Sequence, residues 1–86
     1  MEKLIIIGAG GYAKSVIDSI DIYNYEIMGF IDEFSEQPEH LGYPILAHNL
    51  EQVEDSKKYV YFIAIGNNEK RKKWYERLKS NNLRII

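Results

Sequence analysis

The feature that most constrains the fold is a short apolar run that stops at a cluster of glycines, in the stretch LIIIGAGGYAKSV from Leu4 to Val16. A run of leucine and isoleucine bounded in this way favours a strand buried on both faces. Gly8, Gly10 and Gly11 would destabilise an ordinary structural segment, because glycine loses more backbone entropy on folding than any other residue. The cluster therefore indicates a turn whose backbone adopts positions that other residues disfavour.

Two stretches carry apolar residues at helical spacing. The first follows the glycines directly, and its apolar positions are Ala13, Val16, Ile17 and Ile20. Residues three or four positions apart share one face of a helix, so this stretch is predicted to be an amphipathic helix. The second begins near Asn67 or Asn68, either of which can cap it, and its inner face includes Trp74 and Leu78.

Apolar runs alternate with these helical patterns. YEIMGFI at residues 25–31 and YVYFIAI at residues 59–65 are predicted strands, and residues 83–86 begin a further extended run. Parallel strands need crossover connections, so the alternation predicts a parallel sheet. The predicted fold class is α/β, a small Rossmann-like three-layer domain with a mainly parallel sheet of about four strands. The expected order is second, first, third, fourth.

The segment between the second and third predicted strands has weaker signals. Residues 32–44 are polar and contain both prolines, and we expect them to be irregular. Ile45 and Leu46 can add a short extended piece, and Leu50 and Val53 indicate a brief helix.

Composition narrows the functional classes. The 86 residues suffice for one domain, and 45% hydrophobic with 28% charged residues is typical of a globular chain. A formal net charge of −2 argues against a nucleic-acid partner. The absence of cysteine excludes disulfides and thiolate metal sites. With neither a signal-peptide pattern nor an apolar run of membrane-spanning length, we expect a cytoplasmic domain with no membrane partner.

The glycine cluster matches a phosphate-binding pattern. GAGGYA at residues 8–13 fits G-x-G-x-x-G/A, in which the first glycine makes the turn, the second lets the backbone approach a phosphate, and the final small residue, here Ala13, lets helix pack on strand. Free N–H groups at the helix start then favour an anion. The alternative is a tight turn without a ligand.

Lys14 bears on this choice. A cation in the first helical turn opposes the helix dipole, and no acidic residue precedes Asp18 to offset it. An anion bound at the loop would make the net electrostatic interaction of Lys14 favourable. The alternative is a lysine that simply extends into solvent.

Asp32 and Glu33 follow the second predicted strand. Asp32 lies 24 positions after Gly8, close to the spacing of about 20 at which a carboxylate accepts hydrogen bonds from ribose hydroxyls. A strand-end carboxylate can equally cap a turn. Glu33 alone reads as a solvated side chain.

The third predicted strand ends at another polar edge. Gly66, Asn67, Asn68 and Arg71 form an expected edge for an anion or polar ligand, whereas Lys70, Lys72 and Lys73 are assigned to the solvent face of the helix. His40 and His48 are expected at the surface without a role. No catalytic residue and no metal ligand are predicted.

Four segments in order, IIIGAGGYAKSVIDSI, YEIMGFIDE, LGYPIL and FIAIGNNEKRKK, cover nearly the whole chain. Together they resemble the N-terminal domain of bacterial sugar O-acyltransferases, the family of sialic acid O-acetyltransferases and of the acetyltransferases that act on amino-sugar nucleotides in pilin and protein glycosylation.

The resemblance implies a nucleotide-sugar site, typically for a UDP-sugar. By motif position, the phosphate-side loop comprises Gly8, Gly10, Gly11, Tyr12, Ala13 and Lys14. Asp32 and Glu33 correspond to an acidic pair near the nucleoside, and Gly66, Asn67, Asn68 and Arg71 to the IG-x-N edge. The family commonly has histidine where Tyr12 stands, and often aspartate where Asn67 stands.

The resemblance also implies what lies outside residues 1–86. In such enzymes a C-terminal left-handed β-helix binds acetyl-CoA, carries the catalytic histidine and forms a homotrimer. We therefore expect residues 1–86 to be a single binding domain without a cofactor of its own, not catalytic alone, and a monomer or weak oligomer. Two alternatives stay open: an NAD-type dinucleotide-binding module and a ligand-free regulatory or assembly domain.

Overall fold

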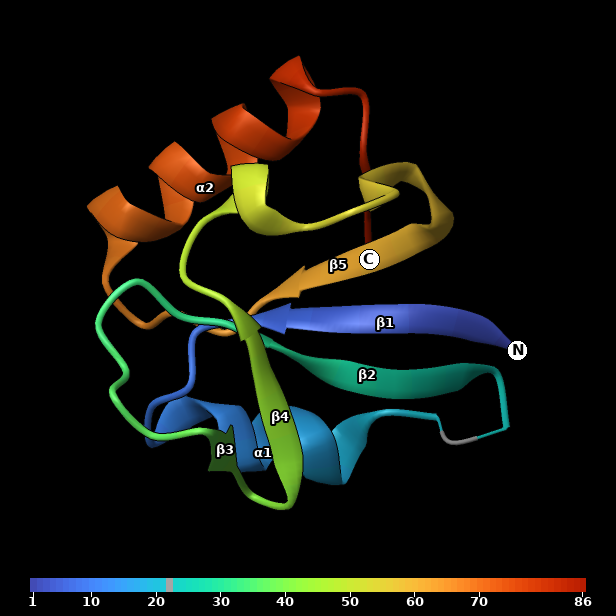
Figure 1. The fold of residues 1–86 in the computed structure, drawn as a ribbon, viewed down its shortest axis with the longest axis vertical. Coiled ribbons are helices and arrows are strands. Elements are labelled where there is room, and N and C mark those ends of the chain that lie inside the picture. Colours follow the sequence, from blue (N-terminus) through green and yellow to red (C-terminus); the bar gives the residue numbers. More distant parts are fainter. Residues whose placement is uncertain (22) are drawn as a thin grey trace.

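The apolar runs of the sequence form the strands at the centre of the molecule. The computed structural model describes residues 1–21 and 23–86 (Figure 1). Four strands correspond to the predicted ones: β1 (Glu2–Ile7), β2 (Tyr25–Ile31), β5 (Tyr59–Ile63) and β6 (Arg84–Ile85). The two helices are α1 (Tyr12–Ser19) and α2 (Asn68–Ser80).

The sheet has the predicted order at its centre and is wider than predicted. Its six strands run β3-β4-β2-β1-β5-β6, and β1 pairs in parallel with both β2 and β5. The additional strand β4 (Tyr43–Ala47) lies parallel to β2, and β3 (Glu39–His40) pairs antiparallel with β4. The predicted α/β class and parallel sheet are confirmed, and the stretch expected to be irregular contributes a short hairpin.

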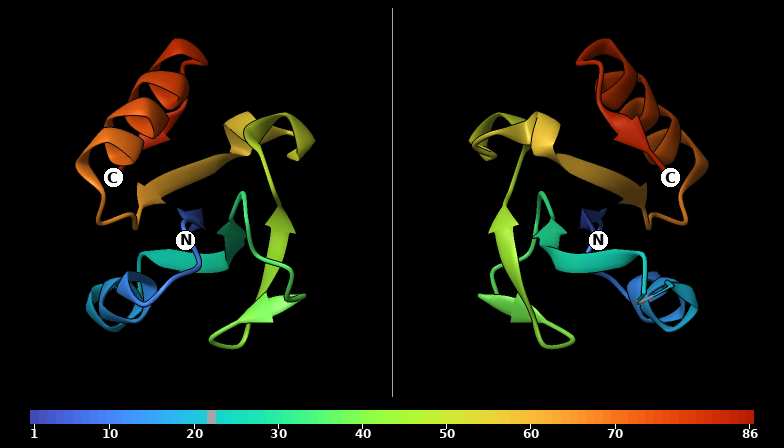
Figure 2. Two further views of the ribbon diagram at one scale, coloured as in Figure 1. Left: turned by 90° about the vertical axis from the view of Figure 1, so that its left-hand side faces the viewer. Right: turned by 90° about the vertical axis from the view of Figure 1, so that its right-hand side faces the viewer.

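The two helices cover opposite faces of the sheet (Figures 1 and 2). On one face, Ile5 and Ile7 of β1 pack with Trp74 and Leu78 of α2. On the other face, Leu4 and Ile6 pack with the inner side of α1. Alternate residues of a strand point to opposite faces, so β1 is buried on both sides, as its uninterrupted apolar run predicts.

Short helical turns complete the layer that α2 begins. The brief helix expected near Leu50 is a 3-10 turn, Leu50–Gln52, and a second one spans Ser56–Lys58. Leu50 joins the core on the α2 face. Helix α1 ends at Ser19, so the predicted helical position Ile20 lies just beyond it with extended backbone. Ile20 still packs against the apolar cluster between α1 and the sheet.

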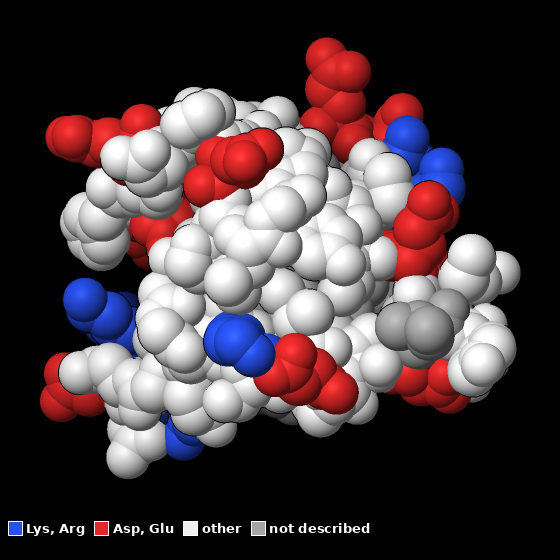
Figure 3. All heavy atoms as spheres, turned by 90° about the horizontal axis from the view of Figure 1, so that it is seen from below, with Lys and Arg blue, Asp and Glu red and all other residues white. Residues whose placement is uncertain are grey.

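Charged side chains are interspersed on the face that carries α1. Acidic and basic groups surround a broad uncharged area there (Figure 3). Lys14 and Asp18 of α1 form an exposed ion pair with Nζ and Oδ2 2.9 Å apart. Mixed charges of this kind do not create a continuous positive field for a polyanion.

The carboxyl ends of the central strands meet at one edge of the sheet. Backbone hydrogen bonds tie them together there, from the Gly8 N–H to the Ile31 carbonyl at 2.8 Å and from the Ala64 N–H to the Ile7 carbonyl at 2.7 Å. Strand β5 ends at Ile63, two residues before the predicted Ile65. The loops that follow β1, β2 and β5 therefore lie close together.

Candidate functional site

A cleft of about 270 Å³ lies where these three loops meet. Strand β1 has β2 on one side and β5 on the other, so the cleft occupies the topological switch point of the sheet. Its lining residues are Gly8, Gly10, Gly11, Tyr12, Ile31, Asp32, Glu33, Phe34, Ala64, Ile65, Gly66, Lys70 and Trp74. Seven of the twelve residues that the sequence predicts for the site lie here.

The glycine turn has one structural and two open positions. Gly8 has a φ of +103°, and a Cβ there would lie 2.7 Å from the Ala64 carbonyl oxygen, so only glycine fits without strain. Gly10 and Gly11 have no atom within 4 Å of an added Cβ, and their open side is the cleft. Steric crowding explains why a glycine stands at position 8. At positions 10 and 11 no protein atom excludes a side chain, so the space beside the backbone is open to the cleft.

Helix α1 starts without a side-chain cap. Gly11 is its N-cap residue, and its first turn has no acidic side chain. Within residues 1–21 and 23–86, the N–H groups of Gly10, Gly11 and Tyr12 donate to no protein acceptor. Such groups at a helix start need water or a ligand, and together with the helix dipole they favour an anion.

Two residues of the predicted loop do not line the cleft. Ala13 is fully buried beneath the turn, where it packs with Leu4 and Ile6, so its small size serves the contact between helix and strand. Lys14 is exposed and bonds to Asp18. No acidic residue before Asp18 is available to offset the charge of Lys14, and in the structure Asp18 itself, one helical turn further on, forms the ion pair with Lys14.

Asp32 cross-links the loops. Its Oδ2 accepts a hydrogen bond from the Ala9 N–H at 2.6 Å, and its Oδ1 accepts from the Phe34 and Ser35 N–H groups at 2.9 and 2.8 Å. Partial burial raises the pKa of Asp32, but these backbone hydrogen bonds, and His40 nearby, outweigh it and hold the pKa below its ordinary value. The turn-capping alternative for Asp32 is thus present in the structure, and it also fixes the glycine turn.

Aromatic side chains line the side of the cleft below α2. The Trp74 Nε1–H donates to the Glu33 carboxylate at 3.1 Å, so Glu33 is engaged by a protein donor rather than only solvated. The exposed Phe34 ring lies 5.3 Å from the Lys70 ammonium. An exposed aromatic ring beside a cation offers a stacking surface next to a positive charge.

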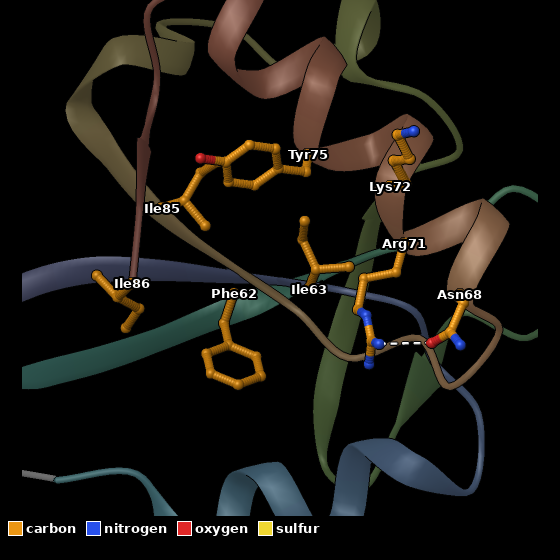
Figure 4. Close-up of a pocket in the computed structure, with 8 residues that line it drawn as sticks. All are labelled: Phe62, Ile63, Asn68, Arg71, Lys72, Tyr75, Ile85 and Ile86. Atoms are coloured by element: carbon orange, nitrogen blue, oxygen red, sulfur yellow. Dashed lines mark hydrogen bonds between the residues drawn. The ribbon is translucent and has the colours of Figure 1, made fainter.

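The start of α2 divides the predicted polar edge between two cavities. Gly66 lines the cleft, while the Asn67 side chain caps α2 by accepting from the Lys70 N–H at 3.0 Å. Asn68 and Arg71 line a second cavity of about 450 Å³ (Figure 4). Lys70, assigned from sequence to the solvent face, lines the cleft in place of Arg71. Lys70 is thus both exposed and at the cleft, whereas Arg71 lies outside the cleft lining.

Both histidines contact the site, although the sequence analysis gave them no role. His40 Nε2 lies 3.2 Å from the Gly10 carbonyl oxygen, and His48 Nδ1 lies 2.9 Å from the Asp32 carbonyl oxygen. Each ring nitrogen donates when it is protonated. Because His40 belongs to the β3–β4 hairpin, only the tertiary structure reveals this contact.

The site is equipped for binding. It combines free N–H donors, an ammonium group, aromatic rings and carboxylates that are already bonded to protein donors. Within residues 1–21 and 23–86, no three His, Cys, Asp or Glu side chains are grouped so that they could hold a metal ion. Across the same residues, no helix has both the length and the apolar character to cross a membrane.

The fold is that of a Rossmann-like α/β domain with a cleft at the switch point of its sheet. Over residues 3–78 the chain matches the PglD N-terminal domain family, and it belongs to that family. The resemblance drawn from the sequence motifs is confirmed, and the domain is of the kind found at the N-terminus of PglD-type acetyltransferases. No solved structure matches the chain.

Proposed function

We propose that the domain binds a UDP-sugar in the switch-point cleft and holds the sugar for acetyl transfer by a separate catalytic domain. The observation that carries the proposal is the uncapped start of α1, where three backbone N–H groups at the cleft have no acceptor within the part of the chain that the structure describes. A diphosphate supplies acceptor oxygens and negative charge at the place where both are missing.

The opposite side of the cleft supports the rest of the ligand. The Lys70 ammonium adds a positive charge for the diphosphate. The Phe34 ring, 75% exposed, provides a flat surface on which a nucleobase can stack. Glu33 lies beside it and can accept from ribose or base donors with the oxygen that Trp74 leaves free.

The chemistry of transfer is assigned to the parent enzyme. Acetyl-CoA is its co-substrate, and a histidine of its β-helical domain removes a proton from the sugar amine or hydroxyl before attack on the thioester. The parent enzyme is a homotrimer in this proposal. Residues 1–86 alone are expected to bind the sugar nucleotide without transferring an acetyl group.

Calorimetric titration tests this function. UDP and UDP-N-acetylglucosamine are expected to bind, and NAD is expected to bind more weakly or not at all. Tighter binding of NAD would support a dinucleotide-binding module instead. If neither UDP-sugars nor NAD bind at millimolar concentration, the domain is a ligand-free regulatory or assembly module.

A further inference from the structure

His40 of β3 contacts the glycine turn from outside the cleft. Its Nε2 lies 3.2 Å from the Gly10 carbonyl oxygen. Gly10 and Gly11 line the cleft, and His40 is not among the lining residues. The ribbon views place β3 on the side of the molecule that carries α1 (Figures 1 and 2). The imidazole therefore reaches the peptide bond between Gly10 and Gly11 from behind, while the cleft lies in front.

The sheet holds the His40 ring in place. The ring meets the fully buried Phe30 ring edge to face, with centroids 5.3 Å apart, an arrangement that stabilises aromatic pairs. In the β3–β4 ladder His40 is paired with Tyr43, whose ring also lies edge-on to Phe30. Strand β4 is in turn paired with β2. The position of the imidazole is thus set by the sheet and not by the flexible glycines that it contacts.

The peptide unit between Gly10 and Gly11 connects His40 to the cleft. A peptide unit is planar and trans, so its C=O and N–H groups point in opposite directions. The Gly10 carbonyl accepts from the Ala13 N–H at 3.2 Å and has a second lone pair for His40. The Gly11 N–H of the same unit has no acceptor in the part of the chain that the structure describes. A bond to the carbonyl from behind therefore keeps this N–H directed away from His40.

A restraint is needed at this peptide because a glycine stands on each side of it. Glycine has no Cβ to limit its backbone, so such a peptide rotates more readily than others. Asp32 holds the preceding part of the turn by accepting from the Ala9 N–H at 2.6 Å. His40 holds the following part through the Gly10 carbonyl. A donor to this carbonyl also polarises the peptide, which makes the Gly11 N–H a stronger donor.

We propose that His40 is a positioning residue for the diphosphate of the sugar nucleotide, an inference that rests on the proposed function of the cleft. Its Nε2–H binds the Gly10 carbonyl, and this bond keeps the Gly11 N–H directed at a phosphate oxygen. His40 acts through the peptide and does not touch the ligand. The short β3–β4 hairpin thereby contributes to nucleotide affinity, although it lies outside the cleft lining.

Two substitutions separate the donor from the ring. His40→Phe keeps an aromatic ring beside Phe30 but has no donor, whereas His40→Gln keeps an N–H donor but has no ring. His40→Phe is expected to weaken binding of UDP-N-acetylglucosamine about tenfold, the equivalent of one hydrogen bond to a charged group, with little change in melting temperature. His40→Gln should bind within about threefold of wild type and should lower the melting temperature. Calorimetry and thermal unfolding on each protein measure both quantities.

The results distinguish the role of His40 from the function of the cleft. Equal affinity of wild type and His40→Phe, or an equally large loss in both variants, would overturn the role of His40 and leave the nucleotide site standing. If wild-type protein binds no UDP-sugar, the proposed function fails and this role fails with it.

Imidazole ¹⁵N NMR tests the donor without any substitution. At mildly alkaline pH, where imidazole is ordinarily neutral, His40 should carry its proton on Nε2. A proton on Nδ1 instead would leave Nε2 unable to donate to the Gly10 carbonyl and would also overturn the proposal.

Discussion

The turns that start the two helices differ in how their first backbone N–H groups are satisfied. At α2, Asn67 caps the helix through its side chain, and Glu69 places a negative charge in the first turn. At α1, Gly11 offers no side chain, and no acidic residue follows in the first turn. Helix α2 therefore supplies its own N-terminal stabilisation, whereas α1 depends on a group from outside the helix.

The α1 turn is nonetheless held firmly from beneath. Gly8 fits where no Cβ can, and the Asp32 carboxylate binds the Ala9 N–H. Gly10 and Gly11 face the cleft without crowding. The same turn thus contains positions that maintain its shape, Gly8 and Ala9, and positions that face the cleft, Gly10 and Gly11. Substitutions can distinguish the two groups.

The largest effect is expected from Gly10→Val. The added side chain meets no protein atom near the Cβ but occupies the cleft, so UDP-sugar binding should fall by more than about a hundredfold while the melting temperature changes little. Calorimetry and thermal unfolding on the same protein check both parts. Gly8→Ala is the matched control and should instead lower the free energy of unfolding by about 1–3 kcal/mol, because its φ of +103° and the nearby Ala64 carbonyl penalise any side chain. Unchanged affinity in folded Gly10→Val protein would show that the turn has no ligand.

The second effect concerns Asp32, which stabilises the turn through three backbone N–H groups. Asp32→Ala is expected to lower the free energy of unfolding by about 2–4 kcal/mol, since hydrogen bonds to a charged group contribute about 1.5–3 kcal/mol each and partial exposure reduces their sum. Asp32→Asn keeps one acceptor and should lose less. Urea unfolding measures both. An unchanged melting temperature with weakened nucleotide binding would instead make Asp32 a ligand-binding residue and not a turn cap.

The same carboxylate makes stability depend on pH. Because the pKa of Asp32 in the folded protein lies below its ordinary value of 3.8, its contribution is complete above that value and is lost as the pH falls through the lowered pKa. Asp32→Asn should flatten the stability profile in this acidic range. The pKa of exposed Glu51 is also lowered, first by a backbone hydrogen bond and then by Arg77. Glu51→Gln therefore serves as the control, because it measures how much of the acid dependence comes from a carboxylate outside the cleft. Retention of the full acid dependence in Asp32→Asn would contradict the assignment.

A smaller effect is expected at the start of α2. Asn67→Ala removes the cap on the Lys70 N–H and should cost about 1 kcal/mol of stability. The nucleotide affinity should stay the same, because the Asn67 side chain is used within the helix. Thermal unfolding together with calorimetry checks this prediction. A loss of affinity without a loss of stability would place Asn67 in the ligand site.

The smallest effect distinguishes the two cations at the start of α2. Lys70→Ala should weaken UDP-sugar binding by about three- to tenfold, less at high salt, because it removes one exposed positive charge from the cleft. Arg71→Ala changes the second cavity and should leave the affinity unchanged. If the two substitutions have equal effects, the charge acts over a distance and not through the cleft.

Local signals made most of the fold predictable, and tertiary geometry determined the rest. The apolar runs at β1, β2 and β5 fix the strands, and the asparagines before α2 fix its start. The hairpin that carries His40 has only two paired residues per strand and turns at Leu41 and Gly42, both with positive φ, so no periodic pattern marks it.

Helical spacing in α2 carried a signal for the cation at the cleft. Lys70 lies four residues before Trp74 and eight before Leu78, the buried residues of α2, so all three lie along one side of the helix. The cap residue, Asn67, accepts from the Lys70 N–H but does not decide which side chains share a face. Gly8, Gly10 and Gly11, by contrast, could be assigned to the cleft directly from the sequence, because their spacing between a strand and a helix is itself the signal.

Amide NMR of the ¹⁵N-labelled chain during a titration with UDP-N-acetylglucosamine tests the central claim most directly. Because the sugar nucleotide is proposed to bind the free N–H groups at the start of α1, the largest shifts should appear at Gly10, Gly11 and Tyr12. The Asn67-capped start of α2 should shift less, and Tyr75 and Ile85, which line the second cavity, should stay unchanged. Shifts centred on the second cavity, or none at millimolar nucleotide, would contradict a nucleotide-sugar site in the switch-point cleft.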